Sequence, residues 1–124
     1  MVRALAAEGA RVAVADISID HAVALAKEIG ESALAVHVDV GDRASVDAMV
    51  EKVVNQFGRL DIIVNNATVF DLAPIMEITE QNFDRLFSIN VKGLLFCVQA
   101  AATDDRAGTW RQDHQYGIAG RSAR

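Results

Sequence analysis

The sequence has one cysteine and one proline among 124 residues. A single thiol cannot form a disulfide within the chain, which excludes the small disulfide-stabilised folds. The one proline and eight glycines are too few for a collagenous or proline-rich chain. No apolar run approaches the roughly 18 residues of a membrane span, and the N-terminus lacks a signal-peptide pattern. We therefore expect a cytoplasmic protein that has no membrane span and no membrane partner.

Basic residues are also scarce, since 12 Lys and Arg stand against 17 Asp and Glu for a net charge of -5. This balance argues against nucleic acid as a partner. The chain is instead rich in apolar residues, at 52%, and is long enough to bury the core of one domain. We assign that domain to residues 1–102. Residues 103–124 contain one branched aliphatic residue, Ile118, and we expect a disordered or non-native tail there.

Short β-branched runs alternate with stretches of helical periodicity along the domain. The predicted strands are residues 11–16, 33–38 and 61–65, and the predicted helices are residues 2–8, 19–29, 43–57, 79–88 and 91–102. This alternation is typical of βαβ units. We predict an α/β fold, a partial Rossmann-like doubly wound parallel sheet with helices on both faces, which binds ligands at the carboxyl ends of its strands.

Acidic residues follow the first two predicted strands. Asp16, followed by Ile17, could accept hydrogen bonds from the ribose hydroxyls of a dinucleotide and would repel a 2′-phosphate, which favours NAD over NADP. The alternative is a solvated aspartate that begins a turn. Asp39 could accept from an adenine amino group while the backbone of Val40 holds the ring, or it could serve only the entry of the next helix.

Asparagines mark two further positions. Asn65, Asn66 and Ala67 end the third predicted strand, where asparagine is a poor strand former, and indicate either a close approach to a ligand or an Asx turn. Asn90 lies in an apolar helical stretch and must find hydrogen-bond partners, for which the backbone of a locally broken helix is one source. No set of His, Cys and carboxylate residues has metal-ligand spacing, and we predict no metal site.

Four motifs in this order resemble the short-chain dehydrogenase/reductase family. They are ADI at 15–17, DV at 39–40, DIIVNNA at 61–67 and FSINVKG at 87–93. The resemblance covers residues 1–102, and the stretch from residue 64 to 93 is similar to the sorbitol and galactitol dehydrogenase branch. It implies an NAD-dependent oxidoreductase that acts on a small polyol. Thr68 departs from the family pattern, which usually has glycine there.

The resemblance also implies roles for individual residues. Asp16 and Ile17 would bind the adenosine ribose, and Asp39 and Val40 the adenine. Residues 65–67 would line the cofactor. Asn90 would be the asparagine of the family's Asn-Ser-Tyr-Lys catalytic tetrad, helping to hold a proton-relay water.

The rest of that tetrad has no match. The one tyrosine, Tyr116, is followed four positions later by Gly120 where the family has lysine, and the glycine-rich turn that begins the family's fold is not found. Codons compatible with residues 103–119, when read in a shifted frame, can encode a stretch that looks like the family's continuation up to its catalytic serine. We therefore expect an N-terminally truncated, frameshifted and inactive fragment.

Two other interpretations are open. A non-catalytic fragment could associate with an intact subunit through residues 83–102, as family members pair through their long helices. A flavodoxin-like or receiver fold is disfavoured because no acidic pair stands near the first strand.

Overall fold

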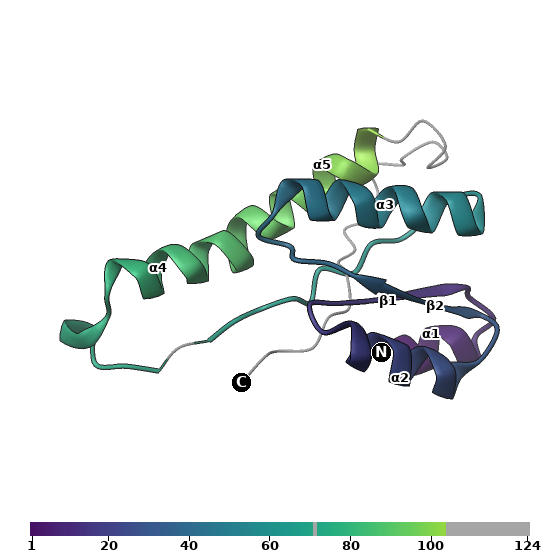
Figure 1. Cartoon of the computed structure of the whole chain (residues 1–124), viewed down its shortest axis with the longest axis horizontal. Coiled ribbons are helices and arrows are strands. Elements are labelled where there is room, and N and C mark those ends of the chain that lie inside the picture. Colours follow the sequence, from purple (N-terminus) through teal and green to yellow (C-terminus); the bar gives the residue numbers. More distant parts are fainter. Residues whose placement is uncertain (71, 104–124) are drawn as a thin grey trace.

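The structure, a computed structural model, describes residues 1–70 and 72–103 (Figure 1). Its two strands are β1 (Val12–Asp16) and β2 (Ala33–His37). Its α-helices are α1 (Val2–Ala7), α2 (Ile19–Ile29), α3 (Arg43–Phe57), α4 (Glu80–Phe87) and α5 (Gly93–Thr103). A 3-10 turn, η1 (Ile75–Glu77), precedes α4, and a π-helical turn, η2 (Ser88–Lys92), joins α4 to α5.

Local sequence explains the bounds of α2 and α3, which agree with the predicted ranges. Ser18 and Asp42 are their N-caps, and the Asp42 side chain accepts a hydrogen bond from the Ala44 N–H at 3.0 Å. Gly58 ends α3 at a φ of 84°, a left-handed conformation that glycine adopts without a Cβ clash.

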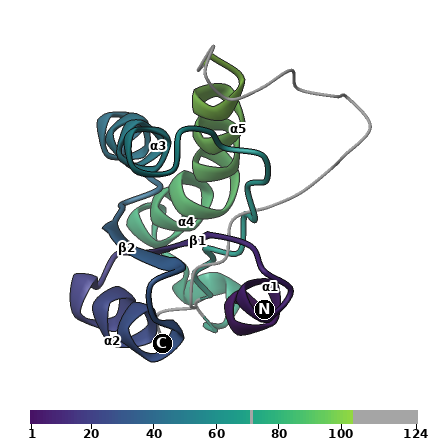
Figure 2. The ribbon, with the colours of Figure 1, turned by 90° about the vertical axis from the view of Figure 1, so that its right-hand side faces the viewer.

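The sheet is parallel, with Val12 opposite Ala33 and Asp16 opposite His37. Helix α2 packs on one face, where Ala22 and Ala26 contact Val14. Helices α3 and α5 lie on the other side (Figure 2), and so the prediction of helices on both faces is confirmed.

The third predicted strand, 61–65, was wrong for this structure. Only Asn65 makes an isolated bridge, and among the described residues β1 and β2 form the whole sheet. A β-branched run becomes a strand only beside a neighbour whose backbone groups complete the ladder. A cleft separates residues 61–64 from β1, and this run therefore has no described ladder partner.

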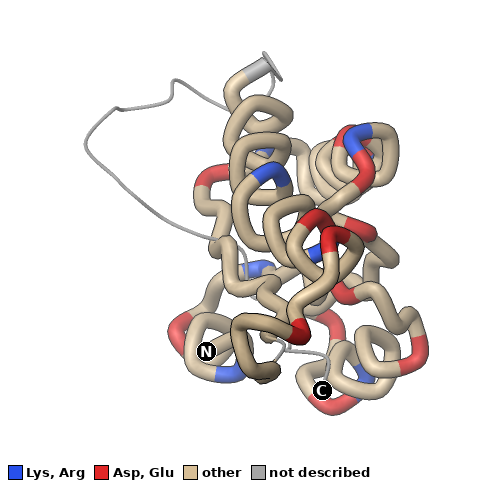
Figure 3. The backbone as a smooth tube through the Cα atoms, turned by 90° about the vertical axis from the view of Figure 1, so that its left-hand side faces the viewer, with Lys and Arg blue, Asp and Glu red and all other residues tan. Residues whose placement is uncertain are grey.

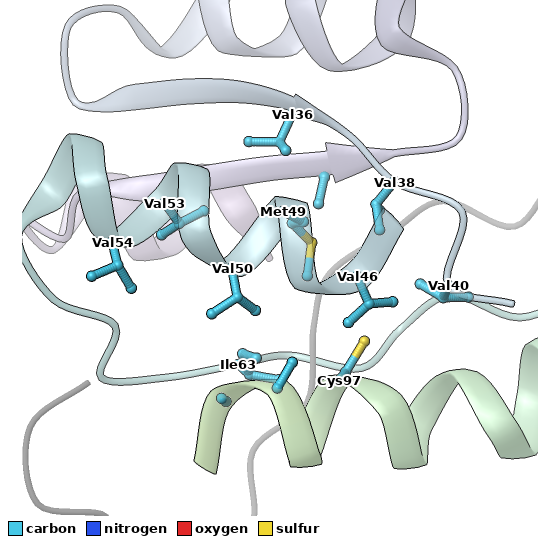
Figure 4. Packing of buried hydrophobic residues seen from close by; sticks show 13 residues of the cluster. Val36, Val38, Val40, Val46, Met49, Val50, Val53, Val54, Ile63 and Cys97 are labelled. Atoms are coloured by element: carbon cyan, nitrogen blue, oxygen red, sulfur yellow. The ribbon is translucent and has the colours of Figure 1, made fainter. Parts of the chain in front are cut away.

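The main core lies between β2, α3 and α5. Val46 and Val54 of α3 are fully buried, and Val46 points toward Cys97 of α5, while Val36 of β2 packs on the other side of α3 (Figure 4). Ile63 joins this cluster although its segment is not a strand. The packing of Ile63 in the core therefore holds its segment in place without strand pairing.

Charged residues of both signs are interspersed along the described chain (Figure 3). Within residues 1–70 and 72–103, no helix combines the length and apolarity needed to cross a bilayer.

Candidate functional site

The carboxyl end of β1 presents the first predicted site residues. The half-buried Asp16 accepts a hydrogen bond at Oδ1 from the backbone N–H of Ser18, at 2.8 Å. Ser18 in turn begins α2, whose first turn includes His21. The turn into α2 thus fixes the Asp16 carboxylate while its second oxygen has no partner among the described residues. Ile17 is exposed beside it.

A polar cavity of about 400 Å³ brings Asp16 together with Asn66. His21 and Glu28 of α2 also line it. Neither residue lies in one of the sequence motifs, and so the sequence reasoning missed both. A helical wheel of α2, with one face placed against β1, would have been the one signal that put them near Asp16. The cavity can therefore offer an oxygen acceptor from Asp16 and an amide from Asn66.

The cavity also contains an exposed ion pair. Arg3 of α1 donates to Glu28, with 2.6 Å between Nε and Oε1. Hydrogen bonding to Arg3 holds the pKa of Glu28 below its ordinary value, and Glu28 raises the pKa of Arg3. Both groups are therefore charged at neutral pH.

Asp39 and Val40 do not line this cavity. The Asp39 N–H donates to Ser45 Oγ, and Asp39 Oδ1 accepts from the Gly41 N–H, both at 2.9 Å. This network is the helix-entry arrangement that was the alternative for Asp39. The buried Val40 side chain packs on Gly93, where a Cβ would lie 2.9 Å from Val40 Cγ2. The Val40 side chain is therefore not available to a ligand.

The Asn90 side chain joins the π-helical turn η2 to residues 68 and 69 by hydrogen bonds. Its Oδ1 accepts from the Val69 N–H at 2.9 Å and from Thr68 Oγ1 at 3.1 Å, and its Nδ2 donates to the Val69 carbonyl at 2.9 Å. The helix takes a π-helical turn here, and the hydrogen bonds of this amide go to residues 68 and 69, not to the backbone of the helix. Asn65 and Ala67 are half-buried, and Ala67 packs against the main core.

Cys97 is fully buried in α5, and burial raises the pKa of its thiol to about 11. The thiol is therefore protonated at neutral pH and acts as a packing group. No cluster of three metal-ligating side chains occurs in the described part of the chain.

Parallel strands with helices on both faces, and acceptor groups at the carboxyl end of a strand, define a Rossmann-like α/β protein. The family model described as short chain dehydrogenase matches residues 1–109. The chain belongs to this oxidoreductase family.

Two curated relatives and one solved structure show what the chain is similar to. It is 54% identical over 101 residues to the sorbitol dehydrogenase of Cereibacter sphaeroides, covering 82% of this chain and 40% of that protein. It is 50% identical over 100 residues to the galactitol 2-dehydrogenase of Agrobacterium fabrum, covering 81% and 39%. A 3-ketoacyl-(acyl-carrier-protein) reductase from Brucella melitensis, solved with NADH, superposes with a TM-score of 0.74 at 34% identity, covering 79% of this chain and 40% of that one. The chain thus spans about two fifths of the length of these relatives.

Proposed function

We propose that this chain supplies the adenosine side of the NAD site of a cytoplasmic polyol dehydrogenase. The observation that carries the proposal is the shared polar cavity of Asp16 and Asn66 at the carboxyl end of β1. The similarity to dehydrogenases named for sorbitol and galactitol supports a polyol substrate. The similarity to a reductase solved with NADH supports the cofactor.

The residues of the cavity fit the ribose of NAD. Ser18 holds Oδ1 of Asp16, which leaves Oδ2 to accept from a ribose hydroxyl. The charge of Asp16 would repel the 2′-phosphate of NADP, whereas the charge of Glu28 is paired with Arg3. Bound NAD would supply the hydride acceptor for the alcohol.

The adenine would lie near Asp39 and the backbone of Val40, with Ile17, Asn65 and Ala67 along the cofactor. Asn90 acts as a positioning residue, because its amide is engaged by Thr68 and Val69 and holds the π-helical turn against that segment. A substitution at Asn90 should therefore lower kcat more than it raises the KM for NAD.

A chimera tests this function. Residues 1–102 replace the aligned stretch of the Cereibacter sphaeroides sorbitol dehydrogenase, and the product should oxidise sorbitol with NAD. Asp16→Ala should raise its KM for NAD at least tenfold and weaken the discrimination against NADP. The matched control is Asp20→Ala, an exposed carboxylate on α2 outside the cavity, which should leave both constants unchanged. Equal effects of the two substitutions would contradict the assignment.

We further propose that these 124 residues alone do not turn over a polyol. The single tyrosine, Tyr116, lies outside the described residues. In the sequence Gly120 stands four positions after it, so the chain has no match to the tyrosine–lysine pair that the family resemblance implies. The purified chain, mixed with NAD and sorbitol, should form no NADH above the rate without protein. Measurable sorbitol-dependent NADH formation would refute this part of the proposal.

A second candidate function is association with an intact dehydrogenase subunit through residues 83–102. The supporting observation is a row of apolar side chains that are 40–50% exposed, namely Phe87, Val91, Leu94, Leu95 and Val98. Co-expression of the chain with the intact relative should give a mixed oligomer by light scattering. Leu94→Asp should abolish it, and Leu72→Asp, at an exposed position outside this row, should not.

A further inference from the structure

The π-helical turn η2 contacts residues 39–41, the segment that would hold the adenine of NAD in the proposed function. At one end of the turn, a Cβ on Gly41 would lie 3.2 Å from Ser88 Oγ. At the other end, the buried Gly93 lies against Val40. Both ends of η2 thus contact one three-residue segment. Such turns inside α-helices are frequent at functional sites.

Gly93 is required for a close approach and not for its backbone conformation. Its φ of -57° and ψ of -44° are helical values that any residue adopts. Glycine forms helix less well than alanine does, so the helix itself gains nothing from it. A Cβ at this position, however, would lie 2.9 Å from Val40 Cγ2, 3.0 Å from Val40 Cβ and 3.1 Å from the Val40 carbonyl oxygen. The missing side chain therefore serves the contact with Val40.

The helix side of this contact is firmly held. Three hydrogen bonds of the Asn90 side chain hold η2 in place. Cys97, one turn further along α5, is fully buried in the main core. Val40 cannot relieve the crowding by rotating its side chain, because its Cβ and its carbonyl oxygen are among the crowded atoms. An added methyl group at Gly93 would therefore displace the backbone of residues 39–41.

That backbone carries the groups that would meet the adenine. Asp39 Oδ1 accepts from the Gly41 N–H at 2.9 Å, and the Asp39 carbonyl accepts from the Asp42 N–H at 3.1 Å. These bonds close a turn that fixes one carboxylate oxygen and leaves Oδ2 to accept from an adenine amino group. Because Val40 lies within this turn, a shift of its backbone moves the Asp39 carboxylate as well.

We propose that Gly93 is a positioning residue for the adenine of NAD. Because it lacks a side chain, η2 lies against Val40, and this contact sets the place of the turn at residues 39–41. The inference rests on the proposed function, which puts the adenine at Asp39 and the backbone of Val40. Gly93 acts through Val40, and so it should affect the affinity for the adenine half of NAD more than the hydride transfer.

Cofactor binding to the chimera described above tests the proposal. Gly93→Ala should raise the Kd for NADH, measured by fluorescence titration, at least fivefold, while kcat at saturating NAD stays within twofold. The Kd for AMP, measured by competition with NADH, should rise by the same factor, because AMP contains the adenine and lacks the nicotinamide. The matched control is Gln81→Ala, at an exposed position of α4 in the same run of helix, which should leave both dissociation constants unchanged.

A second variant covers the case in which circular dichroism shows that Gly93→Ala does not fold. Gly41→Ala places its Cβ 3.2 Å from both Ser88 Oγ and Asp39 Oδ1, which is a milder clash at the same contact. It should raise the same two dissociation constants by a smaller factor. Unchanged constants in a folded Gly41→Ala chimera would then count against the proposal.

The outcomes separate this proposal from the proposed function. A parent chimera that does not bind NADH contradicts the proposed function, and the inference about Gly93 falls with it. If Asp16→Ala weakens NADH binding but Gly93→Ala leaves NADH and AMP binding unchanged, only the positioning role is overturned. A fall in kcat with unchanged dissociation constants would also overturn it, because Gly93 would then act through Asn90 and not through Val40.

Discussion

The α/β body, residues 12–57, and the arm, residues 72–92, use apolar residues differently. Helix α3 of the body buries five side chains, whereas η1, α4 and η2 of the arm contain no buried residue. Val46 in α3 is 0% exposed, and Met76 in the arm is 91% exposed. In Figure 1 the arm extends away from the sheet, and α3 lies along it. Apolar spacing therefore produces helices in both regions, but only a facing element makes a core.

Local interactions explain how the arm keeps its helix. Thr79 and Asn82 form a capping box at the start of α4, and the rings of Phe83 and Phe87 stack with centroids 4.3 Å apart. The helix continues through η2 into α5, whose Cys97 belongs to the main core. The arm is thus anchored at one end by tertiary packing.

The largest expected effect is in the body. Val46→Asp places an unpaired charge in the core between α3 and α5, and should lower the free energy of unfolding by more than about 4 kcal/mol. Urea unfolding followed by circular dichroism measures it. The same substitution at the half-exposed Val91 of the arm should cost less than about 1 kcal/mol. A similar loss in the free energy of unfolding at both positions would contradict the distinction between body and arm.

An intermediate effect is expected where arm and body meet. Asn90→Ala removes the bonds to Thr68 and to both backbone groups of the buried Val69, and should cost about 1–3 kcal/mol. Asn90→Asp keeps the acceptor for the Val69 N–H but loses the donor to its carbonyl. We expect a stability between the parent and the alanine variant by urea unfolding. An Asn90→Ala variant as stable as the parent would show that these hydrogen bonds contribute nothing to the free energy of unfolding.

The smallest effect is expected in the arm. Met76→Ser replaces a side chain that contacts solvent, and should change the free energy of unfolding by less than about 0.5 kcal/mol. The matched test is Met49→Ser, a buried methionine of α3, which should cost several times more. A cost above about 1 kcal/mol for Met76→Ser would mean that the arm is covered in solution.

The parts predicted well from the sequence are those with local signals. Helix α3 matches its predicted range because Asp42, five apolar positions on one face and Gly58 all act within a few residues. Residues 61–65 were mispredicted because a strand needs a neighbour, which no local pattern reports. Asp16 and Asn66 were each expected at a strand end, but only the tertiary structure, which brings residue 66 to the carboxyl end of β1, decides that they share a cavity.

The sequence alone determined the family, the helices and the order of the motifs, since these depend on residue type and spacing along the chain. Only the tertiary structure decided that Asp39 bonds to Ser45 and Gly41, that Asn90 bonds to Val69, and that a cleft opens beside β1. The reason is physical: caps and periodicity act over a turn of helix, whereas hydrogen-bond partners and cavities depend on which distant segments pack together.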